Sequence, residues 1–226
     1  MKELETIGYV IIPDFLNNET IDILRKNYLF QKEIFLKNYD KNGKHNIISG
    51  SYNLDSIFEN VRNNILEQTN LKIGNPAIHH YFDNQITKFV WHQDHACYFE
   101  YPDSYNAVNF WIPIIRKSLT KSGISFVPHN RFYEKYPKIF ERHIKGKGAK
   151  IFKVLDDGNT LMRDDAENLS IVLPFDINDL AITPTLNEGD LLILRQDVVH
   201  RTQDSDYERV AVSVRCYSKY RNQQGI

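Results

Sequence analysis

The spacing of apolar residues changes near residue 75 and divides the chain into two patterns. Before that point, apolar residues recur every three or four positions in two segments, which predicts two amphipathic helices. The first is expected to begin near Asn17 or Asn18, because asparagine caps helix N-termini well. The second is expected to begin at Ser56, which forms a capping box with Glu59. Its apolar stripe comprises Ile57, Val61, Ile65 and Leu66.

Strand-like segments dominate the rest of the chain. A short strand, Gly8–Ile12, precedes the helices, and after residue 75 runs rich in β-branched and aromatic residues alternate with turn residues. These runs predict about eight strands: Ile78–Phe82, Thr87–Trp91, Ala107–Ile115, Gly123–Val127, Ala149–Leu155, Ile171–Pro174, Asp190–Leu194 and Arg209–Tyr217. So many short strands indicate a sandwich or jelly roll. We therefore expect a mainly β protein with flanking helices.

The domain organisation follows from the same patterns. A chain of 226 residues is expected to form one domain, 1–226. Within it, residues 1–74 are expected to form a helical scaffold with the first strand, and residues 75–217 the jelly-roll core. An insertion is expected at about 131–170, where the polar, turn-rich stretch Asp156–Asn168 is the best candidate for a surface loop.

Composition and charge narrow the functional classes. The chain has 28 basic and 29 acidic residues and no block of like charge, so neither nucleic acid nor a membrane surface is an expected partner. No run approaches the roughly 18 apolar residues of a membrane-spanning helix, and the N-terminus does not resemble a secretory signal. The two cysteines, Cys97 and Cys216, form no CxxC motif. These features favour a cytoplasmic location.

Metal-binding chemistry is indicated by one H-x-D motif, His92-Gln93-Asp94. Residues two apart on a strand point to the same face, so the imidazole and the carboxylate can bind one ion together. By itself the motif is weak, because eight histidines and 29 acidic residues in 226 give about one such match by chance. A second imidazole, from His200 just after a buried strand, would complete a set of two histidines and one carboxylate. That set leaves positions open on iron(II) for a bidentate cosubstrate and dioxygen.

The last predicted strand alternates strictly between two faces. One face carries Val210, Val212, Val214 and Cys216, and the other carries Arg209, Ala211, Ser213 and Arg215. The apolar face must pack against other elements, which directs two guanidiniums and a hydroxyl into a cleft or barrel mouth. A buried arginine without a partner is costly, so we expect an anionic ligand there. A dicarboxylate would suit the fork of a guanidinium.

At this point the sequence resembles the phytanoyl-CoA dioxygenase (PhyH-like) family of iron(II)- and 2-oxoglutarate-dependent oxygenases. The likeness rests on Gly8–Leu16, Trp91–Asp94, Asn109–Pro113, Gly123–His129 and Gly189 through His200 to Arg209. It covers most of the chain except about residues 20–75 and 131–185. This sequence departs from the family where Val127-Pro128-His129-Asn130 replaces the usual Pro-Gly-Ser-His turn.

The resemblance implies a double-stranded β-helix in which His92, Asp94 and His200 hold Fe(II). It also implies that Arg209 binds the distal carboxylate of 2-oxoglutarate, with help from Ser213. The cofactors would be Fe(II), 2-oxoglutarate and dioxygen, and the expected reaction is hydroxylation of a small-molecule substrate. Desaturation or cyclisation stays open, whereas chlorination is not expected, because related halogenases have a small residue where this chain has Asp94.

Several questions stay open from the sequence. Arg215 shares a face with Arg209 and could hold the carboxylate instead. Lys88 lies an even number of residues from His92, so it could face the same cavity and contact cosubstrate or substrate. Two other functions fit a jelly roll: a cupin-like metalloprotein, either a 2-oxoglutarate-independent dioxygenase or an isomerase, and a non-catalytic binding module. The identity of the substrate and the oligomeric state do not follow from the sequence.

Overall fold

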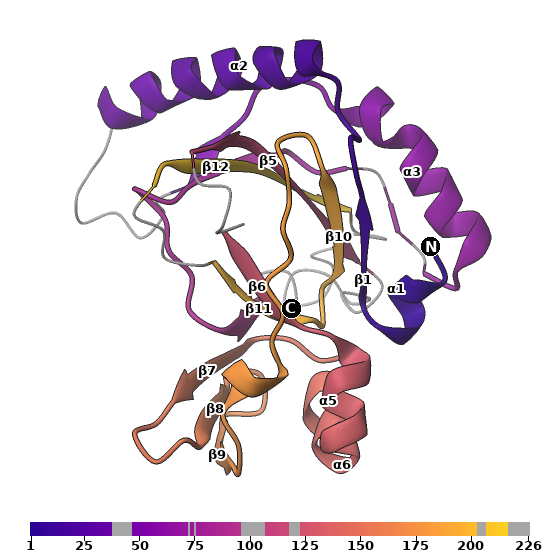
Figure 1. Ribbon diagram of the computed structural model, residues 1–226, viewed down its shortest axis with the longest axis vertical. Helices are drawn as coiled ribbons and strands as arrows, with labels where there is room; N and C mark the ends of the chain where they lie inside the picture. The colour runs from indigo at the N-terminus through magenta and orange to yellow at the C-terminus, as the bar shows by residue number, and fades with distance from the viewer. Residues whose placement is uncertain are drawn as a thin grey trace, which may run out of the picture.

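The computed structural model describes residues 1–37, 47–71, 73–74, 76–95, 107–117, 123–202 and 207–216. Within them the chain forms two antiparallel sheets that face each other (Figure 1). Sheet 1 has the order β1-β10-β5-β12-β3-β2 and sheet 2 the order β6-β11-β4-β7-β8-β9. Sheet 1 comprises β1 (Tyr9–Ile12), β10 (Leu191–Arg195), β5 (Val108–Arg116), β12 (Arg209–Cys216), β3 (His80–Asp83) and β2 (Ile48–Ser49). Sheet 2 comprises β6 (Ile124–Val127), β11 (Val199–Thr202), β4 (His92–Gln93), β7 (Lys150–Val154), β8 (Thr160–Asp164) and β9 (Leu169–Leu173).

Successive strands alternate between the two sheets, which makes the fold a double-stranded β-helix. The chain passes from β3 to β4, β5 and β6, and later from β10 to β11 and β12, changing sheet at each step. A bridge between Phe126 and Ile182 adds one more pairing at the edge of sheet 2. The predicted fold class, a mainly β jelly roll with flanking helices, is confirmed.

Two long helices cover the outer face of sheet 1 (Figure 1). They are α2 (Asn18–Lys37) and α3 (Asp55–Gln68). The predicted start of α2 is confirmed, because the Asn17 side chain accepts a hydrogen bond from the Thr20 amide at 2.8 Å. The capping box predicted for the second helix is wrong: α3 begins at Asp55, and the Asn53 side chain accepts from the Asp55 amide at 2.8 Å. None of the helices in the described part of the chain is long and apolar enough to cross a membrane.

The alternation predicted for the last strand is confirmed. On β12, Val210, Val212 and Val214 are fully buried in a core that also contains residues of α2 and α3. Ala211 belongs instead to a second core between the sheets, with Trp111 of β5. The face of β12 that carries the arginines is therefore directed between the two sheets.

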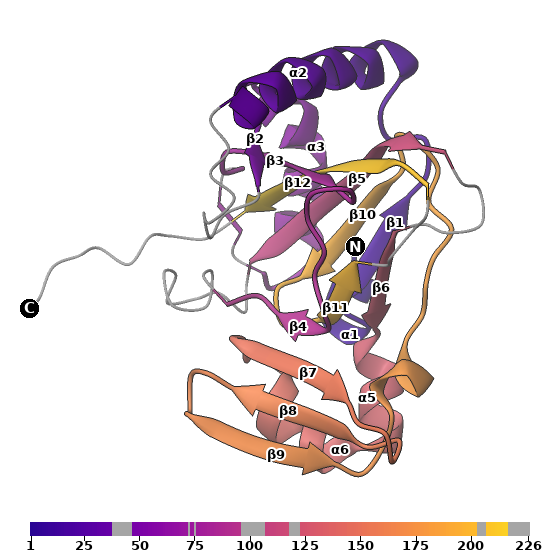
Figure 2. The same ribbon diagram turned by 90° about the vertical axis from the view of Figure 1, so that its left-hand side faces the viewer.

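Sheet 2 continues beyond the barrel, where its last strands and several short helices form an outer layer (Figure 2). Strands β7, β8 and β9 follow β4 in the sheet, and short helices pack against them. These helices are α5 (His129–Lys135), α6 (Pro137–Ile139), the π-helix η2 (Phe140–Ile144) and the 3-10 helix η3 (Ile177–Leu180). A further short helix, α1 (Glu3–Thr6), precedes β1. Because β7 pairs with β4, this layer supports the strand that carries the H-x-D motif.

Two secondary-structure predictions, one of a strand and one of a loop, are wrong. The segment Thr87–Trp91 is not a β-strand. The Phe89 amide donates to the Thr202 hydroxyl and not to a backbone carbonyl, and the strand begins only at His92. The stretch Asp156–Asn168 is not a loop, because it contains β8. Alternate residues of β8, beginning with Thr160, are buried. The polar composition of the segment therefore indicated a loop where the chain forms a half-buried strand.

Candidate metal and cosubstrate site

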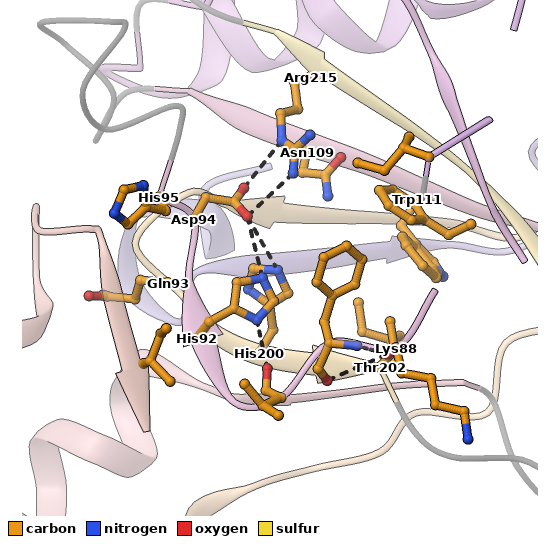
Figure 3. A pocket seen from close by; sticks show the side chains of 16 residues that line it. Lys88, His92, Gln93, Asp94, His95, Asn109, Trp111, His200, Thr202 and Arg215 are labelled. Atoms are coloured by element: carbon orange, nitrogen blue, oxygen red, sulfur yellow. Dashed lines mark hydrogen bonds and ion pairs between the residues drawn. The ribbon is translucent and has the colours of Figure 1, made fainter. Parts of the chain in front are cut away.

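The side chains of His92, Asp94 and His200 converge between the two sheets (Figure 3). His92 and His200 are directly opposed in the β4–β11 ladder, and their ring centroids are 4.3 Å apart. Asp94 Oδ1 lies 3.5 Å from His92 Nε2 and 3.8 Å from His200 Nε2. One ligand atom from each residue lies within 4.8 Å of the others, and no other such group occurs among the described residues.

Backbone carbonyls fix the orientation of both imidazoles. His92 Nδ1 lies 2.7 Å from the carbonyl oxygen of Val90, and His200 Nδ1 lies 2.9 Å from that of Val198. Each Nδ1–H therefore donates to a carbonyl two residues earlier, which leaves the Nε2 lone pair directed at the common centre. This arrangement of the second ring nitrogen is typical of metal-binding histidines.

The electrostatics of Asp94 and His200 favour the protonation states that a metal requires. Burial alone would raise the pKa of Asp94, but the Arg215 guanidinium and the two histidines outweigh it and hold that pKa well below its usual range. Burial, reinforced by the neighbouring His92, lowers the pKa of His200 to about 4. At neutral pH the set therefore offers a carboxylate and a neutral imidazole, both ready to coordinate a cation.

A cavity of about 400 Å³ opens beside the three side chains. Its wall includes Phe82, Phe89 and Trp111, which contact one another through their rings. Most of its exposed surface is apolar, and polar side chains, Asn109 and Arg215 among them, converge on it. A mostly apolar cavity with a few convergent polar groups is typical of a small-molecule site.

Arg209 is buried next to this cavity without a partner. Its side chain is 2% exposed, and none of its three guanidinium nitrogens has a hydrogen-bond partner among the described residues. Its Cζ lies 5.6 Å from the centre of the Trp111 ring, which lines the cavity. Burial lowers the pKa of Arg209 to about 10, so the group is still a cation at neutral pH. A buried cation that lacks an acceptor marks a place for an anion.

The other predicted contacts lie in different places. Arg215 binds Asp94, with Nε 3.3 Å from Oδ2 and Nη2 3.3 Å from Oδ1. The Ser213 hydroxyl donates to Asn109 Oδ1 at 2.8 Å. Lys88 lies at the rim of the cavity, and its chain extends away from the three metal-site residues (Figure 3). The structure therefore brings Arg215 to the metal-site carboxylate, whereas the Arg209 guanidinium makes no hydrogen bond within the described part of the chain.

One structural link at the site was not found from the sequence. Gln93 lies between the two ligands of the H-x-D motif and points to the opposite face, where it is fully buried. Its side-chain amide donates to the carbonyls of Asp197 at 2.6 Å and Ile144 at 3.0 Å. Since Asp197 begins the segment that leads to His200, Gln93 connects both ligand-bearing segments. The alternation of the strand indicated the direction of Gln93 but not its partners.

Comparisons with solved structures identify the class of fold. The nickel complex of ThoJ, described as a non-heme monooxygenase, matches with a TM-score of 0.56 and 12% identity over 96% of this chain and 76% of that one. The non-heme alpha ketoglutarate dependent carbocyclase SnoK from nogalamycin biosynthesis matches with a TM-score of 0.52 and 13% identity, over 99% and 87%. Apo HygX from Streptomyces hygroscopicus matches with a TM-score of 0.50 and 11% identity, over 95% and 83%.

These likenesses establish the fold. The chain has the double-stranded β-helix of these enzymes, two of which are described as non-heme. No family model matches the sequence, and no curated protein matches it either. The resemblance to the phytanoyl-CoA dioxygenase family therefore stays a prediction.

Proposed function

We propose that the protein is a non-haem iron(II)- and 2-oxoglutarate-dependent oxygenase that hydroxylates, or otherwise oxidises, a small-molecule metabolite. The observation that carries the proposal is the combination of two features beside one cavity. His92, Asp94 and His200 present three metal-binding atoms within 4.8 Å of one another. Arg209 presents a buried cation whose guanidinium nitrogens have no hydrogen-bond partner among the residues that the structure describes.

The three side chains fit iron(II). Two neutral imidazoles and one carboxylate on one side of the ion are the donor set of non-haem iron oxygenases, and they leave the opposite side open. The fixed Nδ1 hydrogen bonds orient both histidines before any ion arrives. Arg215 contacts both oxygens of Asp94 and so holds the carboxylate in place, with Oδ1 3.5 Å from His92 Nε2. Bound there, iron would activate dioxygen and couple it to the oxidative decarboxylation of the 2-oxo acid.

The buried guanidinium fits the distal carboxylate of 2-oxoglutarate. Arg209 offers two parallel N–H donors to a carboxylate, and such a charge-assisted pair strengthens where water is excluded. Trp111 supports the guanidinium from one side, and the aromatic wall of Phe82 and Phe89 keeps water from the same region. The chain thus supplies binding, orientation and a dry pocket, while the cofactor supplies the difficult chemistry.

The buried guanidinium and the three metal-binding side chains together distinguish this proposal from its alternatives. A cupin-like dioxygenase or isomerase that does not use 2-oxoglutarate has no need of a buried guanidinium beside the metal site. A non-catalytic module has no need of three converging metal ligands. A cavity of about 400 Å³ favours a small substrate over a macromolecule. We also propose that the enzyme is cytoplasmic and that neither nucleic acid nor a membrane is its partner.

The test is the iron-dependent conversion of 2-oxoglutarate to succinate, measured by mass spectrometry with and without fractions of a metabolite extract. The proposal expects slow succinate formation by the protein with iron(II), and faster formation when a fraction contains the substrate. His200→Ala is expected to abolish both, whereas Arg142→Ala, at an exposed residue outside the cavity, is expected to retain both. Dioxygen uptake with oxidised product but no succinate would favour the cupin-like alternative.

A further inference from the structure

A second hollow of about 580 Å³ lies on the outer side of sheet 2, and we call it the outer groove. It shares Lys88, Phe89, Val90 and Thr202 with the cavity of the candidate site, so the segment 88–90 is the wall between them. Val90 is 63% exposed and offers an apolar rim over which a ligand can pass from one side to the other. The outer groove is therefore an extension of the candidate site.

The position of Arg201 in the groove follows from strand alternation. Arg201 comes directly after His200 on β11, so the two side chains point to opposite faces of sheet 2. His200 lines the inner cavity, and Arg201 lines the outer groove. A ligand whose reacting carbon lies near His200 therefore has a cation close by on the other side of one strand.

The charge of the outer groove is positive. Arg201, Lys153 and Lys88 line it, and no acidic side chain lines it among the described residues. Three cations around one hollow produce a positive potential that attracts and orients anions. The neutral walls come mainly from aromatic and aliphatic side chains such as Phe152 and Val154, which leaves a hollow suited to a ligand with an apolar body and an anionic group.

The guanidinium of Arg201 is held in place before any ligand binds. Its Cζ lies 4.6 Å from the centre of the Trp91 ring, and the Trp91 ring is itself fixed because its Nε1–H donates to Asn178 Oδ1 at 3.1 Å. Arg201 Nε is buried and has no hydrogen-bond partner among the described residues. The arrangement repeats that of Arg209 over Trp111, in which a cation lies against an indole with donors unused. A stacked guanidinium loses little side-chain entropy when an anion binds.

We propose that the outer groove binds an anionic group, a phosphate or a carboxylate, on the part of the substrate that is remote from the oxidised carbon. The inference rests on the proposed function, because it places the reacting end of the same molecule in the inner cavity. Arg201 is the main contact, Lys153 and Lys88 add charge, and the Val90 rim contacts the apolar linker. Substrates would then be anionic metabolites, selected by a contact outside the barrel.

The two tryptophans provide a separate reporter for each arginine. The chain contains only Trp91 and Trp111, so a Trp111→Phe variant reports on Arg201 and a Trp91→Phe variant reports on Arg209. Inorganic pyrophosphate and tricarballylate, a tricarboxylate, are titrated into metal-free Trp111→Phe protein while its fluorescence is followed. We expect a saturable change that Arg201→Gln weakens about tenfold, because one charge-assisted contact is lost. Arg142→Gln, which removes an exposed cation outside the groove, is expected to leave the affinity unchanged.

The outcome for each probe decides the proposal. Saturation by pyrophosphate alone assigns a phosphate, and saturation by tricarballylate alone assigns a carboxylate. Saturation by neither, or a response that Arg201→Gln leaves intact, overturns the proposal. In the Trp91→Phe variant, 2-oxoglutarate with a divalent ion is expected to change the fluorescence of Trp111. If 2-oxoglutarate causes no such change, the proposed function is contradicted and not the proposal for the outer groove. If the change is retained when Arg201→Gln is added to the Trp91→Phe variant, the Arg201→Gln protein is folded.

Discussion

Gly123 leaves the space that the side chain of Arg209 occupies. A Cβ atom at position 123 would lie 1.9 Å from Arg209 Cδ and 2.2 Å from Arg209 Nε, far inside van der Waals contact. The glycine also has a φ of +87°, which other residues adopt only with strain. One small residue directly before β6 therefore permits a guanidinium to lie buried beside the cavity.

Gly123→Ala is expected to displace Arg209 and raise the KM for 2-oxoglutarate at least tenfold, with a smaller effect on iron binding. Gly158→Ala is the matched control, because Gly158 has a φ of +80° but nothing lies within 4 Å of an added Cβ. Both substitutions carry a backbone strain of about 1–3 kcal/mol, so the difference between them isolates the collision with Arg209. Succinate formation at varied 2-oxoglutarate concentration measures the effect. Equal KM values in the two variants would contradict the role given to Arg209.

Arg209→Ala and Arg215→Ala are expected to affect different constants. Loss of the bidentate pair at Arg209 is expected to raise the KM for 2-oxoglutarate about 100-fold, and Arg209→Lys should restore only part of it. Arg215 binds Asp94 instead, so Arg215→Ala is expected to weaken metal binding by about 10- to 100-fold. Titration calorimetry with manganese and kinetics with 2-oxoglutarate distinguish the two. If Arg215→Ala destroys 2-oxoglutarate use while Arg209→Ala leaves it intact, the assignment is reversed.

Asp94 is expected to determine both metal retention and the type of product. Asp94→Ala removes the only carboxylate among the three converging ligands, so iron content after dialysis is expected to fall steeply with activity. The wild-type protein is expected to give oxidised products without chlorine even in excess chloride, because the carboxylate occupies the position that chloride would need. High-resolution mass spectrometry of the product checks this, and a chlorine isotope pattern would contradict it.

Stability at acid pH is expected to depend on Asp83. This buried carboxylate accepts hydrogen bonds from Tyr28 at 2.7 Å and Lys32 at 2.8 Å and so ties α2 to β3. Burial raises its pKa, but these hydrogen bonds outweigh burial and keep the pKa below its ordinary value of 3.8. Because the folded-state pKa is depressed, the stabilisation is complete above about pH 4 and is lost as the pH falls further.

Asp83→Asn is therefore expected to lower the free energy of unfolding by about 1–3 kcal/mol at pH 7, with a smaller difference at pH 3. Asp22→Asn serves as the control on the same helix, because the Asp22 side chain is 60% exposed and pairs with Arg25 at the surface. Urea unfolding followed by circular dichroism measures both. A pH-independent loss in Asp83→Asn would show that packing, and not the charge, is responsible.

The sequence predicted the parts of the site that depend on local spacing. His92 and Asp94 are two residues apart, and strand geometry alone places them on one face. The arginines of β12 were assigned to the inner face for the same reason. The other contacts of the site depend on how strands that are distant in the sequence pair with each other. This pairing places His200 opposite His92 and brings Arg215 to Asp94. The strand β8 was missed because polar residues such as Asp164 are buried there through pairing with Lys150, a long-range contact that composition does not reveal.

Anaerobic titration of the metal-free protein with iron(II) and then 2-oxoglutarate tests the central claim most directly. The charge-transfer absorption of iron(II) chelated by a 2-oxo acid reports both events at once. The account predicts that this absorption develops with one equivalent of iron, is absent in His200→Ala, and requires far more 2-oxoglutarate in Arg209→Ala. Binding of iron without any such absorption at saturating 2-oxoglutarate would contradict it and favour a metalloprotein that does not use this cosubstrate.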